Sequence, residues 1–135
     1  MRLQLFSYSY SVMCYSVPMD TPTFKKKLLT EKDLVEKELG TVGRRNPNTA
    51  GDWEPVASDL GGASPDRDEA AEKIETFEEN TAIVRQLESR LGEIKDALER
   101  LENGSYGHCV TCEKEIEADR LGANPAATTC KAHMR

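Results

Sequence analysis

Two pairs of potential metal ligands near the C-terminus constrain the fold of this chain more than any other feature. Cys109 and Cys112 form a Cys-x-x-Cys pair, and Cys130 and His133 form a second pair with the same internal spacing. Paired ligands separated by fifteen to twenty residues are typical of a tetrahedral zinc site. Thiolates and imidazoles suit Zn²⁺ better than they suit Mg²⁺ or Ca²⁺. We therefore predict one zinc ion, bound by Cys109, Cys112, Cys130 and His133.

This zinc site is expected to be structural. Four protein ligands leave no open position at which a water molecule could be activated. The stretch from 104 to 133 is also short and polar, so we expect the metal to hold it folded. No arrangement of a nucleophile and a base is visible elsewhere, and the sequence therefore does not indicate an enzyme.

These cysteine and histidine residues have other possible uses. A Cys-x-x-Cys pair can be a redox site, but no strand–helix alternation of a thioredoxin-like fold accompanies it. A disulfide scaffold fits poorly with long charged helices and the absence of a convincing export signal. His108 is an alternative fourth ligand, although its place next to Cys109 gives it poorer geometry than His133. Cys14 receives no role.

The middle of the chain predicts a long helix from Pro65 to Asn103. Ser64 and Pro65 are typical of a helix start, and the acids that follow are favoured by the helix dipole. Gly104 provides a stop. At 1.5 Å per residue this helix would be roughly 58 Å long. Its apolar residues recur at spacings of three, four or seven, which is typical of a coiled-coil stripe: Ile74, Phe77, Val84, Leu87, Leu91, Ile94, Leu98 and Leu101.

A shorter helix is predicted from Pro22 to Leu39. Thr21 and Pro22 favour its start, and Gly40 and Gly43 are stop signals. The fold class is therefore mainly α: a coiled-coil hairpin with a long second helix, followed by a small treble-clef-like zinc finger. Because the first helix has about half the length of the second, two arrangements remain open. Either residues 53–60 add a short helix, or the start of the long helix projects partly unpaired.

Three regions follow from these elements. Residues 1–18 carry one basic residue, no acid and several serines that interrupt the apolar run, so they predict a disordered tail or a stretch upstream of a true start at Met19. Residues 19–103 form the hairpin, with a broken connection over 41–64 that is rich in Gly, Pro and Asn. Trp53 and Val56 are expected to pack back from this connection onto a helix. Residues 104–135 form the finger.

Charge excludes several classes of function. The formal net charge is −6, and 31% of the residues are charged while 6% are aromatic. Such an acidic balance argues against a protein that binds nucleic-acid phosphates, and residues 106–135 carry as many acids as bases.

No run of eighteen apolar residues exists, so no transmembrane helix is expected, and we expect the cytoplasm as the location. Acids are concentrated at the start of the long helix, either as a solvated face or as an interaction tip.

The finger resembles the zinc-finger signature of the DksA/TraR family. The resemblance rests on Tyr106-Gly107 before the first cysteine pair, on Ile116, and on the run from Arg120 to Ala126 before Cys130. The long helix agrees with the coiled-coil hairpin of that family. Two positions of the finger differ from the family pattern. His133 stands where the best-known members have a cysteine, and Glu113 stands where glycine is usual, so a left-handed backbone there would cost about 1 kcal/mol.

The resemblance implies a bacterial regulator of transcription initiation. Members of the family insert an acidic coiled-coil tip into the secondary channel of RNA polymerase and do not bind DNA themselves. Their tip motif, Asp-x-x-Asp-x-Ala, falls on Asp66, Glu69 and Ala71 of this chain, with a glutamate in place of the second aspartate. The alternative is a zinc-stabilised helical interaction module that docks on another partner.

Overall fold

The computed structural model describes residues 20–57 and 67–134. The expectation for residues 1–18 and the predicted tip residue Asp66 therefore lie outside the described part. The elements are, in chain order, α1 (Thr21–Val42), β1 (Gly43–Arg45), β2 (Trp53–Pro55), α2 (Arg67–Asn103), α3 (Ala118–Ala123) and the 3-10 turn η1 (Lys131–His133). The mainly helical fold class is confirmed. Among the described residues, no helix combines the length and apolar character that crossing a membrane would require.

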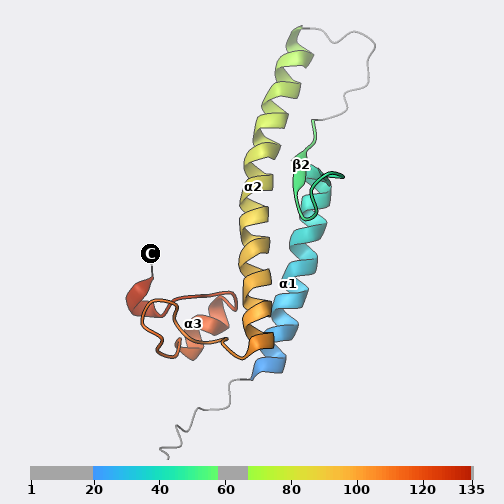
Figure 1. Cartoon of the computed structure of the whole chain (residues 1–135). Coiled ribbons are helices and arrows are strands. Elements are labelled where there is room, and N and C mark those ends of the chain that lie inside the picture. Colours follow the sequence, from blue (N-terminus) through green and yellow to red (C-terminus); the bar gives the residue numbers. More distant parts are fainter. Residues whose placement is uncertain (1–19, 58–66, 135) are drawn as a thin grey trace, which may run out of the picture.

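The helices α1 and α2 lie side by side and run antiparallel (Figure 1). Leu28 and Leu39 of α1 and Ile94 of α2 are fully buried between them. These positions belong to the apolar stripes seen in the sequence, because residues three, four or seven apart share one face of a helix. Burial of these stripes holds the hairpin together.

The first helix is longer than expected. It begins at Thr21, with Pro22 in its first turn, and passes through Gly40 to end at Val42. The stop predicted at Gly40 is wrong, because this residue faces open space and interrupts no packing. The helix ends where the Val42 carbonyl accepts a hydrogen bond of 3.1 Å from the backbone N–H of Val56, which lies just after β2. A tertiary contact therefore sets this boundary.

The connection contains a small antiparallel sheet that the sequence analysis missed. Gly43 pairs with Pro55, and Arg45 pairs with Trp53. The turn between the strands is closed by Asn46, whose backbone N–H donates to the Asp52 carbonyl at 2.9 Å and whose side-chain amide donates to the Asp52 carboxylate at 2.7 Å. Residues 43–45 and 53–55 are thus strands within the region expected to be a broken connection.

Trp53 packs back onto the hairpin, as expected. Its ring lies against the buried core, and the Arg45 guanidinium stacks over it at 5.2 Å from the ring centroid. Its backbone N–H donates to the Glu88 carboxylate of α2 at 2.8 Å. Val56, also expected to pack back, is half-buried. The short helix considered for residues 53–60 is wrong for the part that the structure describes.

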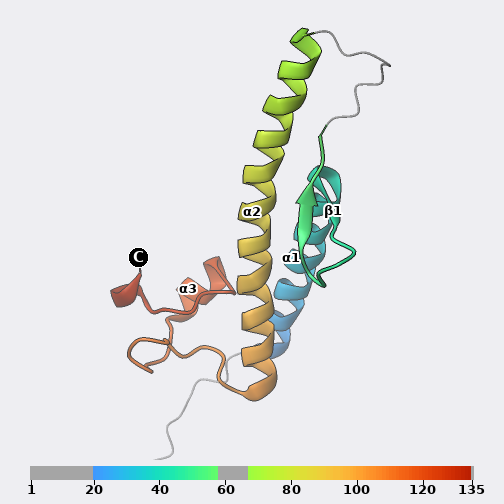
Figure 2. The same ribbon diagram turned by 45° about the horizontal axis from the view of Figure 1, so that its top comes forward.

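The start of α2 extends past the end of α1 (Figures 1 and 2). The end of α1 lies level with Val84, since a Cβ atom added to Gly43 would stand 3.2 Å from a Val84 methyl group. The side-chain amide of Asn80 reaches the Val56 carbonyl at 2.7 Å. Closer to the start of α2, Ile74 is 62% exposed and Phe77 is 44% exposed. Of the two arrangements left open, the projecting helix is the one observed.

The finger packs against the other end of the hairpin. The backbone N–H groups of Ser105 and Tyr106 donate to the Arg100 carbonyl at 3.0 and 3.1 Å and turn the chain away from α2. Buried Tyr106 lies beside Phe24 of α1, with 6.0 Å between the ring centroids. The finger and the hairpin therefore share one apolar core.

Candidate metal centre

The first ligand pair sits in a tight turn. The Cys109 carbonyl accepts from the backbone N–H of Glu113 at 2.9 Å, and the Cys109 N–H donates to the Lys114 carbonyl at 2.8 Å. Glu113 has a positive φ of 60°. These bonds turn the chain back on itself, so the side chains of Cys109 and Cys112 point to the same side.

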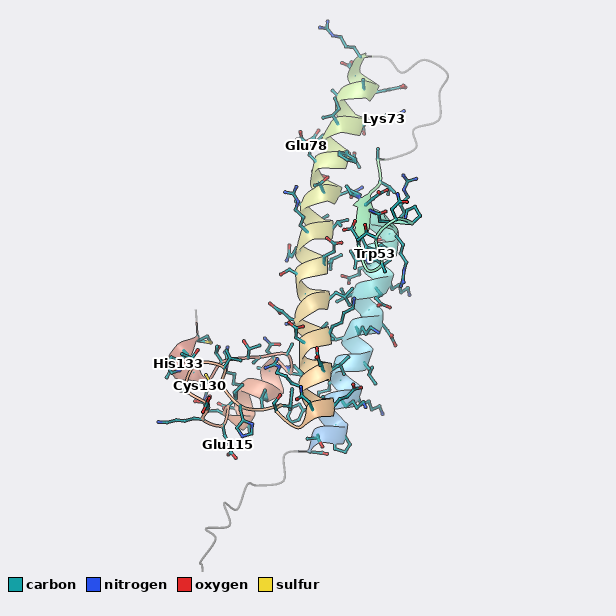
Figure 3. The ribbon with its side chains drawn as sticks, viewed as in Figure 1. Trp53, Lys73, Glu78, Glu115, Cys130 and His133 are labelled. Carbon is teal, nitrogen blue, oxygen red and sulfur yellow. The ribbon has the colours of Figure 1, made fainter. Side chains whose placement is uncertain are left out.

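The second pair is brought to the first by the segment after α3. The backbone N–H of Val110 donates to the Thr128 carbonyl at 2.9 Å, which joins the two halves of the finger. Cys130 precedes η1, and the His133 N–H donates back to the Cys130 carbonyl at 3.0 Å. Figure 3 shows Cys130 and His133 together at the outer end of the finger.

The four ligand atoms form a compact cluster. The sulfur atoms of Cys109, Cys112 and Cys130 and a ring nitrogen of His133 all lie within 4.8 Å of one another. Cys112 Sγ is 3.8 Å from Cys130 Sγ, and His133 Nδ1 is 3.8 Å from Cys109 Sγ and 3.2 Å from Cys130 Sγ. Zn–S bonds of about 2.3 Å and Zn–N bonds of about 2.0 Å at tetrahedral angles require ligand–ligand distances of about 3.5–3.8 Å. The cluster therefore fits one structural zinc ion.

The same distances exclude a disulfide in this part of the chain. A sulfur–sulfur bond is about 2.05 Å long, and the three cysteines that the structure describes are free. His108, the alternative fourth ligand, is exposed and bridges to Glu115 through its backbone rather than joining the cluster.

Electrostatics favour the metal-binding thiolate form at Cys109 and disfavour it at Cys112. Burial raises the pKa of the Cys109 thiol, but hydrogen bonds from the backbone of Cys130, Thr111 and Cys112 outweigh it and bring the pKa down to about 5. The backbone of Lys114 lowers the pKa of Cys112, whereas burial and the neighbouring thiols raise it overall. A divalent cation stabilises both thiolates at once, which suits a site of this composition.

Several contacts stabilise the chain segments around the metal site. The Tyr106 hydroxyl donates to the Pro125 carbonyl at 2.6 Å. Burial raises the pKa of Tyr106 to about 12, against the opposing charge of Arg100. Lys131 forms an ion pair with Asp119, and its backbone N–H donates to the Glu117 carboxylate at 3.0 Å. These bonds fix the segment that carries Cys130 and His133.

Arg90 joins three parts of the molecule. Its guanidinium bonds the Glu31 carboxylate of α1 at 2.6–2.7 Å, Glu93 of α2 at 2.8 Å, and the Asn124 side chain of the finger at 3.0 Å. Partial burial lowers the pKa of Arg90, but the bonds to Glu31 and Glu93 raise it overall. Arg90 and Glu93 are three residues apart in one helix, a spacing at which side chains meet, whereas the partners in α1 and in the finger are far away along the chain.

The start of α2, which carries Glu69 and Ala71 of the predicted tip, lies at the opposite end of the molecule from the finger (Figure 1). Glu69 and Ala71 are exposed in the first turns of α2. The third residue, Asp66, is outside the described residues. The roles given to Asp66, Glu69 and Ala71 by the family resemblance stay predictions.

Comparisons with known proteins agree with this geometry. Residues 104–132 match the sequence profile of the family described as "Prokaryotic dksA/traR C4-type zinc finger". YteA, an uncharacterized protein of Bacillus subtilis (strain 168), is 42% identical over 57 residues, which is 41% of this chain and only 24% of the length of YteA. The structure of transcription factor DksA2 from Pseudomonas aeruginosa superposes with a TM-score of 0.63 at 24% identity, covering 82% of this chain and 76% of that one. Residues 104–132 thus form a finger of the dksA/traR C4 type, carried on a helical fold similar to that of DksA2.

Proposed function

We propose that this chain is a bacterial regulator of transcription initiation that binds RNA polymerase. DksA/TraR proteins are regulatory factors rather than enzymes. The observation that carries the proposal is the combination of a DksA/TraR finger with a helical hairpin whose far end is acidic. Between residues 67 and 83, α2 has six acidic and two basic side chains. An acidic projection on a rigid helix can enter a positively lined channel without binding DNA.

The zinc ion in this proposal is held by Cys109, Cys112, Cys130 and His133. It supplies four bonds that close the finger and no chemistry of its own. The assignment predicts one zinc per chain in purified protein. Cys130→Ala and His133→Ala should each weaken zinc retention against a chelator, and His108→Ala is the matched control. Retention unchanged in the His133→Ala protein would contradict the assignment.

The working end of the molecule in this proposal is the tip formed by Asp66, Glu69 and Ala71. We propose that it enters the secondary channel of the polymerase, as the family resemblance implies. Glu69 carries one more methylene group than the aspartate of the family motif, so its carboxylate reaches further from the helix. The finger and the hairpin base would remain outside the channel as a support.

The test is binding of the full-length, zinc-loaded protein to core RNA polymerase, together with transcription in vitro. We expect binding at micromolar concentration, and loss of the transcription effect in the Asp66→Asn/Glu69→Gln variant. The control is Glu99→Gln/Glu102→Gln, which removes two acids at the other end of α2. Absence of binding at micromolar concentration would refute the proposal.

The second candidate is an interaction module that docks on a different protein. It is favoured by the end of α1 at Val42, because no other helix of residues 20–57 or 67–134 runs beside the far part of α2, where a coiled coil would have one. The two functions are separated by the Asp66→Asn/Glu69→Gln variant. A variant that binds polymerase and keeps its full effect on transcription would argue for a working surface elsewhere.

A further inference from the structure

The projecting part of α2 carries an apolar stripe. Ala70, Ile74, Phe77 and Thr81 follow one another at spacings of four, three and four residues, and Val84 continues the series. This is the heptad spacing with which a helix packs against a partner. Val84 is 2% exposed and meets the end of α1, whereas Ile74 is 62% exposed and Phe77 is 44% exposed.

The cause of this exposure lies in α1. A helix continuing beyond Val42 would have followed α2 toward its start, but the chain turns back into β1 and β2 instead. Figure 2 shows α2 continuing past both of them, and Lys73 and Glu78 mark this part of the helix in Figure 3. Large apolar side chains at packing spacing are therefore left on the surface, which is typical of an interaction site.

Charge distinguishes between the possible occupants of the stripe. Residues 67–83 carry a net charge of −4. Pairing two copies of this chain through the stripe would bring these like charges together, which disfavours a second copy. The segment 58–66 contains only one large apolar residue, Leu60, and two more acids. A basic partner satisfies both the apolar stripe and the charge around it.

We infer that the stripe Ala70–Ile74–Phe77–Thr81 docks on an apolar groove bordered by Lys and Arg side chains on the polymerase. This inference rests on the proposed function and adds a second contact to the tip. Glu69 of the tip lies in the first turn of α2, whereas the stripe continues along the side of this helix. Ile74 and Phe77 provide the buried anchor of the contact, and the surrounding acids match the basic border of the groove.

The experiment measures the affinity of the full-length, zinc-loaded protein for immobilised core RNA polymerase. The test variant is Ile74→Gln/Phe77→Gln, since glutamine keeps the helix propensity while removing the apolar surface. The control is Ile83→Gln, which replaces an exposed isoleucine (42%) nine residues from Ile74 and about half a turn away around the helix. We expect the test variant to bind at least about tenfold more weakly, and the control to bind within about twofold of wild type.

Each of the other outcomes contradicts the inference and points to a different explanation. If wild type binds and both variants bind equally well, the stripe is not a contact while the proposed function stands. If the wild-type protein does not bind, the inference and the proposed function both fail. A fall of several degrees in the melting temperature of the test variant would mean that segment 58–66 covers the stripe. A wild-type dimer in sedimentation equilibrium that becomes monomeric in the test variant would mean that a second copy covers it.

Discussion

Glu113 holds a left-handed backbone conformation in the turn between the first two zinc ligands. Its φ is 60°, and it is the only non-glycine residue with positive φ among those the structure describes. A side chain at this position crowds its own backbone and costs about 1 kcal/mol relative to glycine. The turn nevertheless forms, because the bonds from Glu113 to Cys109 and from Cys109 to Lys114 hold it.

Replacing Glu113 by glycine should therefore stabilise the zinc-loaded protein by about 1 kcal/mol. Guanidinium unfolding followed by circular dichroism measures the change in the free energy of unfolding. The matched control is Lys114→Gly, one residue later at an ordinary φ, where glycine should destabilise by about 0.5–1 kcal/mol. Equal effects of the two changes would contradict the idea that strain sits at Glu113.

The zinc cluster and the strain at Glu113 could both be predicted from sequence, because both depend on short stretches of chain. Two residues between ligands leave little freedom in a turn, whatever the rest of the molecule does. Arg90 shows the opposite case. Its partners Glu31 and Asn124 lie 59 and 34 residues away in sequence, so only the folded packing reveals the bond.

At the scale of elements, periodicity predicted both long helices but not the two-stranded sheet. Strands of three residues are too short to show the alternation by which strands are recognised. Gly43 is a helix stop, as predicted, because α1 ends at Val42 and Gly43 is its C-cap. Gly43 also lets the chain pass close to β2 and α2. A Cβ atom there would stand 2.9 Å from the Glu54 carbonyl oxygen and 3.2 Å from a Val84 methyl group.

Two glycines three residues apart should therefore respond in opposite directions to alanine. Gly43→Ala should destabilise the protein by about 1–3 kcal/mol, because the backbone of β2 cannot yield without breaking the sheet. Gly40→Ala should stabilise it by about 0.5–1 kcal/mol, because this position is helical and faces open space. Thermal unfolding of the two variants side by side tests this. A neutral Gly43→Ala would mean that β1 and β2 are not held against α2 as described.

At the scale of the whole molecule, the hairpin and the finger are joined through Arg90. A planar guanidinium can bond in three directions at once, whereas a lysine ammonium at the same place cannot reach all three partners. Arg90→Lys should lower the free energy of unfolding by about 1 kcal/mol. Arg85→Lys, an exposed position on the same helix, should change it by less than about 0.5 kcal/mol. Equal stability of the two variants, measured by guanidinium unfolding, would show that the three-way contact does not form.

Zinc removal should separate the finger from the hairpin. The finger contributes the six residues of α3, whereas α1 and α2 contribute 22 and 37 and bury Leu28, Leu39 and Ile94 between themselves. Chelation should therefore unfold residues 104–133 while removing only about a tenth of the helical signal at 222 nm. The melting temperature of the remaining hairpin should also fall, because Phe24 loses its contact with Tyr106.

Hydrogen exchange provides the residue-level measurement of this separation. In the metal-free protein, the backbone amides of Cys109, Val110 and Ile116 should lose protection, because their bonds all lie within the finger. Amides in the middle of α2, around Leu91 and Ile94, should keep theirs, and added zinc should restore the first group. Loss of protection in both groups would mean that the hairpin cannot fold without the finger. Unchanged protection in both, with removal of the metal verified, would mean that the ion does not hold the finger together.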